Sequence, residues 1–133
     1  MFRSFDLPTD RVDQGELLSL LSYADPEEVK AFAAEIAESL GTIEVISKRT
    51  ALARLPIVGS DGRQETFEAL VTEVCVHATN GADGYGMCIG TDEDHAIAIA
   101  VLDVALAADS VGLLTGKINA FLQAQAALLA QAS

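Results

Sequence analysis

The side chains of this 133-residue chain that could carry acid–base chemistry lie in one region. His95 follows the acidic run 92–94, and Asp103 lies inside the apolar run Ile97–Leu106. A histidine titrates near neutral pH, so His95 could act as a general acid or base. We favour a helix-start histidine held by neighbouring carboxylates, because no triad partner is visible in the sequence. An unpaired buried carboxylate is costly, so Asp103 either faces outward or has a polar partner.

A second set of reactive residues falls on a predicted β-hairpin. The dipeptide Asn80-Gly81 favours a two-residue turn between the strands Phe67–Ala78 and Gly84–Ile89. In that register Val76 faces Tyr85, and the core face holds Val74, Val76, Tyr85, Met87 and Ile89. Because side chains alternate along a strand, the opposite face collects Glu73, Cys75, His77, Gly84, Gly86, Cys88 and Gly90.

Three interpretations of that second face remain open. Cys75, His77 and Cys88 could hold a metal ion, but the closely spaced ligand pairs typical of zinc sites are absent. The preferred interpretation makes both cysteines small, half-buried hydrophobic residues. In the third, the glycine-lined strip is a place where another backbone or a ligand approaches closely. No cofactor is expected.

Candidate phosphate- and anion-binding residues are few. The glycine run Gly84–Gly90 has its third glycine one residue late for a dinucleotide-binding loop. The segment Gly112–Lys117 is one residue short of a P-loop, and Ile118 follows it where a P-loop needs Ser or Thr. Neither segment is expected to bind a nucleotide. The basic residues Lys48, Arg49 and Arg54 could hold a small anion, and ordinary strand-end charge is the alternative.

The periodicity of apolar residues indicates the elements that would position these side chains. Helical spacing predicts a helix ending near Tyr23, a second one started by Asp25-Pro26 and stopped by Gly41, and two more over about 96–106 and 111–130. Thr91 and Asp94 resemble a capping box before the third helix. Alternation predicts four strands over 42–48, 51–58, 67–78 and 84–89. The expected fold is a single α+β domain over residues 1–133, an antiparallel four-stranded meander with two N-terminal and two C-terminal helices.

Composition excludes several classes of protein. The chain has 20 acidic and 8 basic side chains, a net charge of −12, which opposes binding to nucleic acid. Half of its residues are apolar, which excludes a disordered chain. No run of about 18 apolar residues is present, so no membrane span is expected. Two cysteines without a secretory signal favour a cytoplasmic protein, with residues 1–11 flexible.

Charge is distributed unevenly along the sequence. All acidic residues lie between Asp6 and Asp109, whereas Lys117 is the one charged residue from Ser110 to Ser133. A solvated tail is normally rich in charge, so segment 111–131 is expected to be a docking helix. Its apolar contact residues are expected to be Leu114, Ile118, Phe121, Leu122 and Leu128.

Segment Phe67–Ala108 resembles the PhnG family of the carbon–phosphorus lyase system. The family's motifs fall here on Val71-Thr72-Glu73, on the turn from Gly81 to Tyr85, on Gly90-Thr91-Asp92 with His95-Ala96, and on Asp103. Upstream, Ile43–Ile46 is similar to a family strand. The acids Glu93 and Asp94 replace basic residues common at the family's helix start, and a basic C-terminal extension is missing.

The resemblance implies an α+β accessory subunit without the main catalytic role. It implies partners among the lyase core subunits, in particular a nucleosidase-like PhnI-type subunit, or a homo-oligomer. The assembly would transfer a phosphonate to C1′ of a nucleoside triphosphate ribose and displace the base. His95 and Asp103 are the candidate catalytic residues because they match family positions. The alternative is a stand-alone module, diverged from that family and without enzymatic activity, that binds a small anion or a partner.

Overall fold

Local sequence signals define the start of the second helix. Asp25 Oδ1 accepts a hydrogen bond from the backbone N–H of Glu27 at 3.2 Å, and Pro26 stands in the first turn. Gly41, after the helix, has a φ of +76°, which other residues rarely adopt. The predicted N-cap is therefore confirmed, whereas the predicted stop at Gly41 is wrong, because α2 ends at Ala37 with Glu38 as its C-cap.

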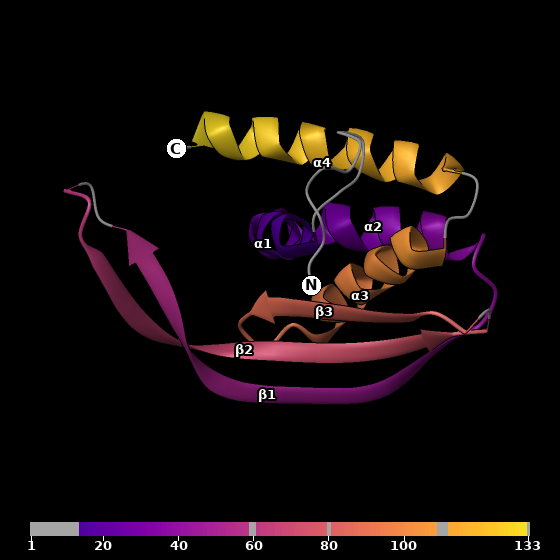
Figure 1. Cartoon of the computed structure of the whole chain (residues 1–133), viewed down its shortest axis with the longest axis horizontal. Coiled ribbons are helices and arrows are strands. Elements are labelled where there is room, and N and C mark those ends of the chain that lie inside the picture. The colour runs from indigo at the N-terminus through magenta and orange to yellow at the C-terminus, as the bar shows by residue number, and fades with distance from the viewer. Residues whose placement is uncertain (1–13, 59–60, 80, 109–111, 133) are drawn as a thin grey trace.

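The computed structural model describes residues 14–58, 61–79, 81–108 and 112–132. The expectation that residues 1–11 are flexible lies outside them. The described part of the chain contains α1 (Gln14–Tyr23), α2 (Pro26–Ala37), β1 (Ile43–Val58), β2 (Gln64–Ala78), β3 (Asp83–Ile89), α3 (Glu93–Ala108) and α4 (Leu113–Ala132). The α+β class is confirmed, and all four helices lie on one side of the sheet (Figure 1).

The sheet has three antiparallel strands in the order β1-β2-β3 among the described residues, so the predicted four-stranded meander is wrong. Segments 42–48 and 51–58 form one strand, β1. The ladder continues across the expected break, because Arg49 pairs with Glu73 and Thr50 with Thr72. The irregularity is a bulge between Val45 and Ser47.

The hairpin between β2 and β3 has a three-residue connection. The N–H of Ala78 donates to the carbonyl of Ala82, and the N–H of Gly81 donates to the carbonyl of Ala78, both at 2.9 Å. Gly81 has a φ of +97°, typical of the glycine that closes such a loop. Val76 therefore pairs with Gly84 and not with Tyr85.

This change of one residue reverses the predicted faces of β3, because side chains alternate with period two. The face toward the helices holds Val74, Val76, Gly84, Gly86 and Cys88. The face without helices holds Glu73, Cys75, His77, Tyr85 and Met87. The predicted grouping was thus wrong for every residue of β3.

Helix α3 packs at backbone distance on β3. A Cβ at Gly84 would lie 2.4 Å from the carbonyl oxygen of Ala100, and one at Gly86 would lie 2.1 Å from that of Ala96. The interpretation of the glycine strip as a site of close backbone approach is confirmed, and the approaching backbone is that of α3.

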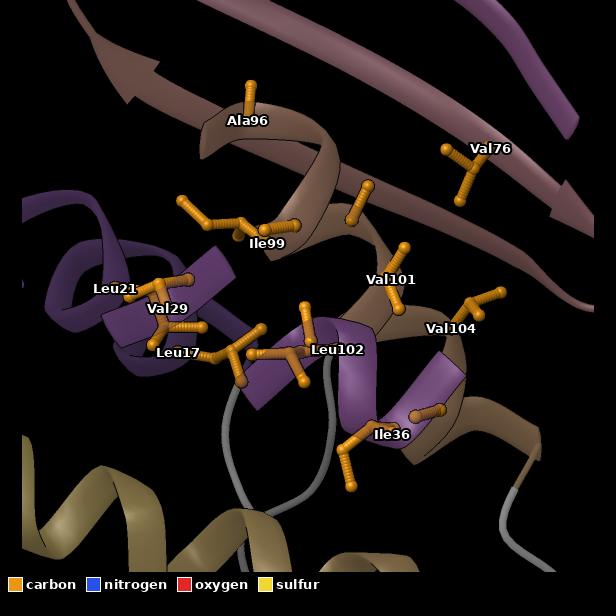
Figure 2. Packing of buried hydrophobic residues seen from close by; sticks show 14 of the residues in the cluster. Leu17, Leu21, Val29, Ile36, Val76, Ala96, Ile99, Val101, Leu102 and Val104 are labelled. Carbon is orange, nitrogen blue, oxygen red and sulfur yellow. The ribbon is translucent and has the colours of Figure 1, made fainter. Parts of the chain in front are cut away.

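The core lies between the sheet and the helices, with α3 at its centre (Figure 1). Figure 2 shows Ile99 and Leu102 of α3 beside Leu17 and Leu21 of α1 and Val29 of α2. Burial on nearly all sides explains why α3 is apolar around its circumference. None of the helices in the described residues is both long and apolar enough to cross a bilayer.

Candidate functional site

The N-terminus of α3 is organised by Asp92. Its Oδ1 accepts a hydrogen bond from the backbone N–H of His95 at 3.1 Å, and Lys30 Nζ of α2 lies 3.0 Å from its Oδ2. The hydrogen bond from Lys30 lowers the pKa of Asp92. The cap is therefore Asp92, and the predicted capping box of Thr91 and Asp94 is replaced by this residue, which lies between them.

His95 is a buried histidine with a structural partner. Its side chain is 3% exposed, and Nε2 lies 2.9 Å from the carbonyl oxygen of Leu21 at the end of α1. A carbonyl oxygen accepts hydrogen bonds, so Nε2 carries the proton and donates it. His95 thereby joins α3 to α1 through its ring, and the expected neighbouring carboxylate, that of Asp92, binds its backbone N–H.

Asp103 has the polar partner that its place in an apolar run required. Its Oδ2 accepts a hydrogen bond from the backbone N–H of Tyr85 at 2.8 Å. Tyr85 lies on β3, an edge strand of the sheet. The carboxylate of α3 therefore satisfies an outward-pointing donor that no neighbouring strand reaches.

The three residues of the predicted metal alternative do not converge. Cys88 is fully buried on the face toward α3, whereas Cys75 and His77 lie on the opposite face. Cys88 Sγ donates to the carbonyl of Asp92 at 3.3 Å, and His77 Nδ1 lies 2.6 Å from Asp83 Oδ1. Burial raises the pKa of the Cys88 thiol. Across the described ranges, no three or more His, Cys, Asp and Glu side chains form a group suited to a metal.

The predicted anion-binding cations are separated and paired. Lys48 Nζ lies 3.0 Å from Glu93 Oε1, Arg54 Nε lies 3.9 Å from Glu68 Oε2, and Arg49 pairs with Glu73. The register of β1 places Arg49 on the face opposite to Lys48 and Arg54. The three residues therefore do not form one basic patch.

A polar network that the sequence did not indicate lies on the sheet face without helices. Tyr85 Oη donates to Glu73 Oε2 at 2.5 Å, and Arg49 Nε donates to Glu73 Oε1 at 3.1 Å. The bonds from Tyr85 and then Arg49 lower the pKa of Glu73. Burial and the adjacent Glu73 raise the pKa of Tyr85, so its phenol remains protonated at neutral pH. A register that pairs Tyr85 with Cys75 places Tyr85 on the same sheet face as Glu73, and this register would have indicated their contact from the sequence.

The expected docking helix is partly covered by the chain itself. Ile118 and Leu122 are buried, and Phe121 stacks on Phe32 of α2 with ring centroids 4.2 Å apart. Leu114 is half-buried, whereas Leu128 remains 48% exposed. Most of the apolar face of α4 therefore contributes to the core.

No protein-family model matches the chain, and a search of curated proteins finds no matching relative.

Proposed function

We propose that this chain is an accessory, PhnG-like subunit of a cytoplasmic carbon–phosphorus lyase assembly. In that role it would assist a nucleosidase-like partner in transferring a phosphonate to C1′ of a nucleoside triphosphate ribose, with displacement of the base. The proposal rests on the resemblance of segment 67–108 to that family. Its structural support is that several residues of this segment hold helix α3 in position.

Several residues of segment 67–108 hold α3 in place, whereas the motif residue Glu73 lies on the sheet face without helices. Gly84 and Gly86 allow the backbone of α3 to approach β3, and Asp92 caps the helix. His95 binds the end of α1, and Asp103 binds the edge of β3. This observation supports a framework role for these residues. It favours a subunit that presents surfaces to a partner over one that performs the main chemistry.

Co-purification would test the proposal. The full chain is co-expressed with the nucleosidase-like PhnI-type subunit of a carbon–phosphorus lyase system from the same host, and the mixture is separated by size-exclusion chromatography with light scattering. We expect a stable complex of defined mass. Failure of the two proteins to associate at micromolar concentration would contradict the proposal.

A ligand screen separates the proposal from the stand-alone alternative. Thermal unfolding of the isolated chain is measured with an alkylphosphonate, inorganic phosphate and ATP. A ligand that binds the folded chain alone raises the melting temperature. We expect no rise, because Lys48, Arg49 and Arg54 are already paired with carboxylates. A specific rise with one ligand would favour the small-anion module.

A further inference from the structure

Strand β1 has one edge that no strand of the described chain covers. It runs over 16 residues at the end of the sheet, and Figure 1 shows β2 on one side of it and open space on the other. Beyond the pair Val71–Ile89, where β3 ends, β1 and β2 continue as a two-stranded arm. Such an arm is marginally stable in water without further packing.

The hydrogen-bond pattern identifies the backbone groups at this free edge. The carbonyl of Leu70 accepts a bond from the N–H of Gly90 at 2.7 Å, so its backbone groups point toward β3. In an antiparallel pair the residue opposite then points away from β2. Leu70 pairs with Leu52, so the N–H and C=O of Leu52 point outward. By alternation the same holds for Lys48, Thr50 and Arg54.

Pro56 follows the same alternation and lies at an outward position. It has no N–H, and proline is tolerated in a strand where that group would not bond to the neighbouring strand. After the bulge at Val45–Ser47, the edge from Lys48 to Pro56 is therefore a regular ladder of donors and acceptors that no strand of the described residues covers, with Pro56 supplying an acceptor alone. An extended backbone is the occupant that matches such a ladder.

The side chains beside this ladder favour a second copy of the same chain. Leu52 is 68% exposed and is the most exposed large hydrophobic side chain in the described residues. Residues 43–78 carry five acidic and four basic side chains, a net charge of −1, so the rest of the chain carries −11 of the total −12. This hairpin and segment 110–133, which carries Lys117 as its one charge, are therefore the two parts of the sequence along which two acidic copies repel each other little.

We propose that two copies pair antiparallel through their β1 edges, with Leu52 opposite Leu52 of the second copy. This register places the outward-pointing residues of both copies opposite each other, Thr50 against Arg54 and Lys48 against Pro56. In this register no two basic side chains lie opposite each other. A register centred on Ala51 would place Lys48 of one copy directly opposite Arg54 of the other. The result is a continuous six-stranded sheet with the helices of both copies on one side.

Sedimentation equilibrium of the full chain tests the pairing. We expect a monomer–dimer equilibrium with a dissociation constant in the micromolar range, because an edge contact is smaller than a standard interface. Leu52→Lys opposes two charges at the centre of the contact and is expected to weaken dimerisation at least tenfold. Leu128→Lys, the same change at an exposed leucine of α4, is the matched control and should leave the dissociation constant unchanged.

Cross-linking tests the register. In a Cys75→Ser background, Leu52→Cys should give a disulfide-linked dimer under mild oxidation, because directly opposite Cα atoms lie about 5.5 Å apart. Leu128→Cys should not cross-link. A chain that stays monomeric at about 200 µM, or a dimer that Leu52→Lys leaves intact, would overturn the proposal.

The pairing does not depend on the proposed function. A monomer that still forms a complex with the nucleosidase-like subunit would overturn the dimer and leave the accessory role standing. A dimer that does not bind that subunit would support the pairing and contradict the accessory role.

Discussion

Glu73 shows how the sheet face without helices is stabilised at the level of single residues. Its carboxylate is half-buried and accepts hydrogen bonds from Tyr85 on one neighbouring strand and Arg49 on the other. The network therefore joins all three strands through one acidic side chain. Hydrogen bonds to a charged group are stronger than those between neutral groups.

Removing the hydroxyl of Tyr85 tests this network and its pH dependence. We expect Tyr85→Phe to lower the free energy of unfolding by about 1 kcal/mol at pH 7, after allowance for partial exposure. The pKa of Glu73 is lowered in the folded chain, so its bonds contribute stability above its ordinary pKa of 4.5 and lose it as pH falls through the folded pKa. The difference between variant and wild type, measured by urea unfolding, should therefore shrink below about pH 4. A difference independent of pH would contradict the assignment.

Substitution of His95 tests whether its ring has a structural role, through the contact with Leu21. His95→Phe leaves the carbonyl of Leu21 without its donor and should cost about 1–3 kcal/mol of unfolding free energy. His77→Phe is the control, because it removes a largely solvent-exposed contact with Asp83, and it should change stability by about 0.5 kcal/mol or less. Urea unfolding at constant slope measures both. Equal stability of the two variants would show that the Leu21 contact is unimportant.

At the scale of elements, the joint between β3 and α3 determines the position of the longest buried helix. Gly84 and Gly86 face α3 because the loop between β2 and β3 has three residues. Their missing side chains let the carbonyls of Ala96 and Ala100 come close to the strand. The polar ends of this joint are fixed by Asp92 and Asp103.

A methyl group placed in this joint should be strongly destabilising. Gly86→Ala forces the strand and the helix apart, and we expect a loss of about 3 kcal/mol or more, at the upper end of overpacking effects. Gly116→Ala is the matched control, because a Cβ at Gly116 in α4 would meet no side chain or neighbouring element within 4 Å. It should raise stability by up to about 1 kcal/mol through helix propensity. Thermal unfolding distinguishes the two, and a tolerated Gly86→Ala would refute the close packing.

At the scale of the whole molecule, the net charge of −12 is an unfavourable term for the compact state. Several of the described cations are paired, with Glu93, Glu73, Glu68 and Asp92 as partners. The chain has 12 more acidic than basic side chains, so most of the acidic excess has no cation available to pair with, and folding brings these carboxylates closer together.

Salt should consequently stabilise the chain. Raising NaCl from about 0.01 M to about 0.15 M shortens the screening length from about 30 Å to about 8 Å. We expect the melting temperature to rise over this range, because repulsion among the excess carboxylates outweighs a few exposed ion pairs. A falling melting temperature would mean that the ion pairs dominate.

Local sequence signals were sufficient to predict structural features whose contacts are close in sequence. Asp25-Pro26 predicted the start of α2, because an N-cap depends on neighbouring residues, whereas the helix ends at Ala37, before the predicted stop at Gly41. The apolar run around Asp103 predicted both a buried helix and a partner for its carboxylate. That partner, the N–H of Tyr85, could not be named without the packing of α3 on β3.

The sequence alone therefore determined the mixed α+β class, the start of α2 and the strongly acidic character of the chain. Tertiary structure decided which residues share a face and which share a bond. One additional residue in the loop ending at Gly81 reversed β3, buried Cys88 and brought Tyr85 to Glu73. Alternation along a strand transmits such a local choice to every residue that follows, whereas the contacts that select it come from distant segments.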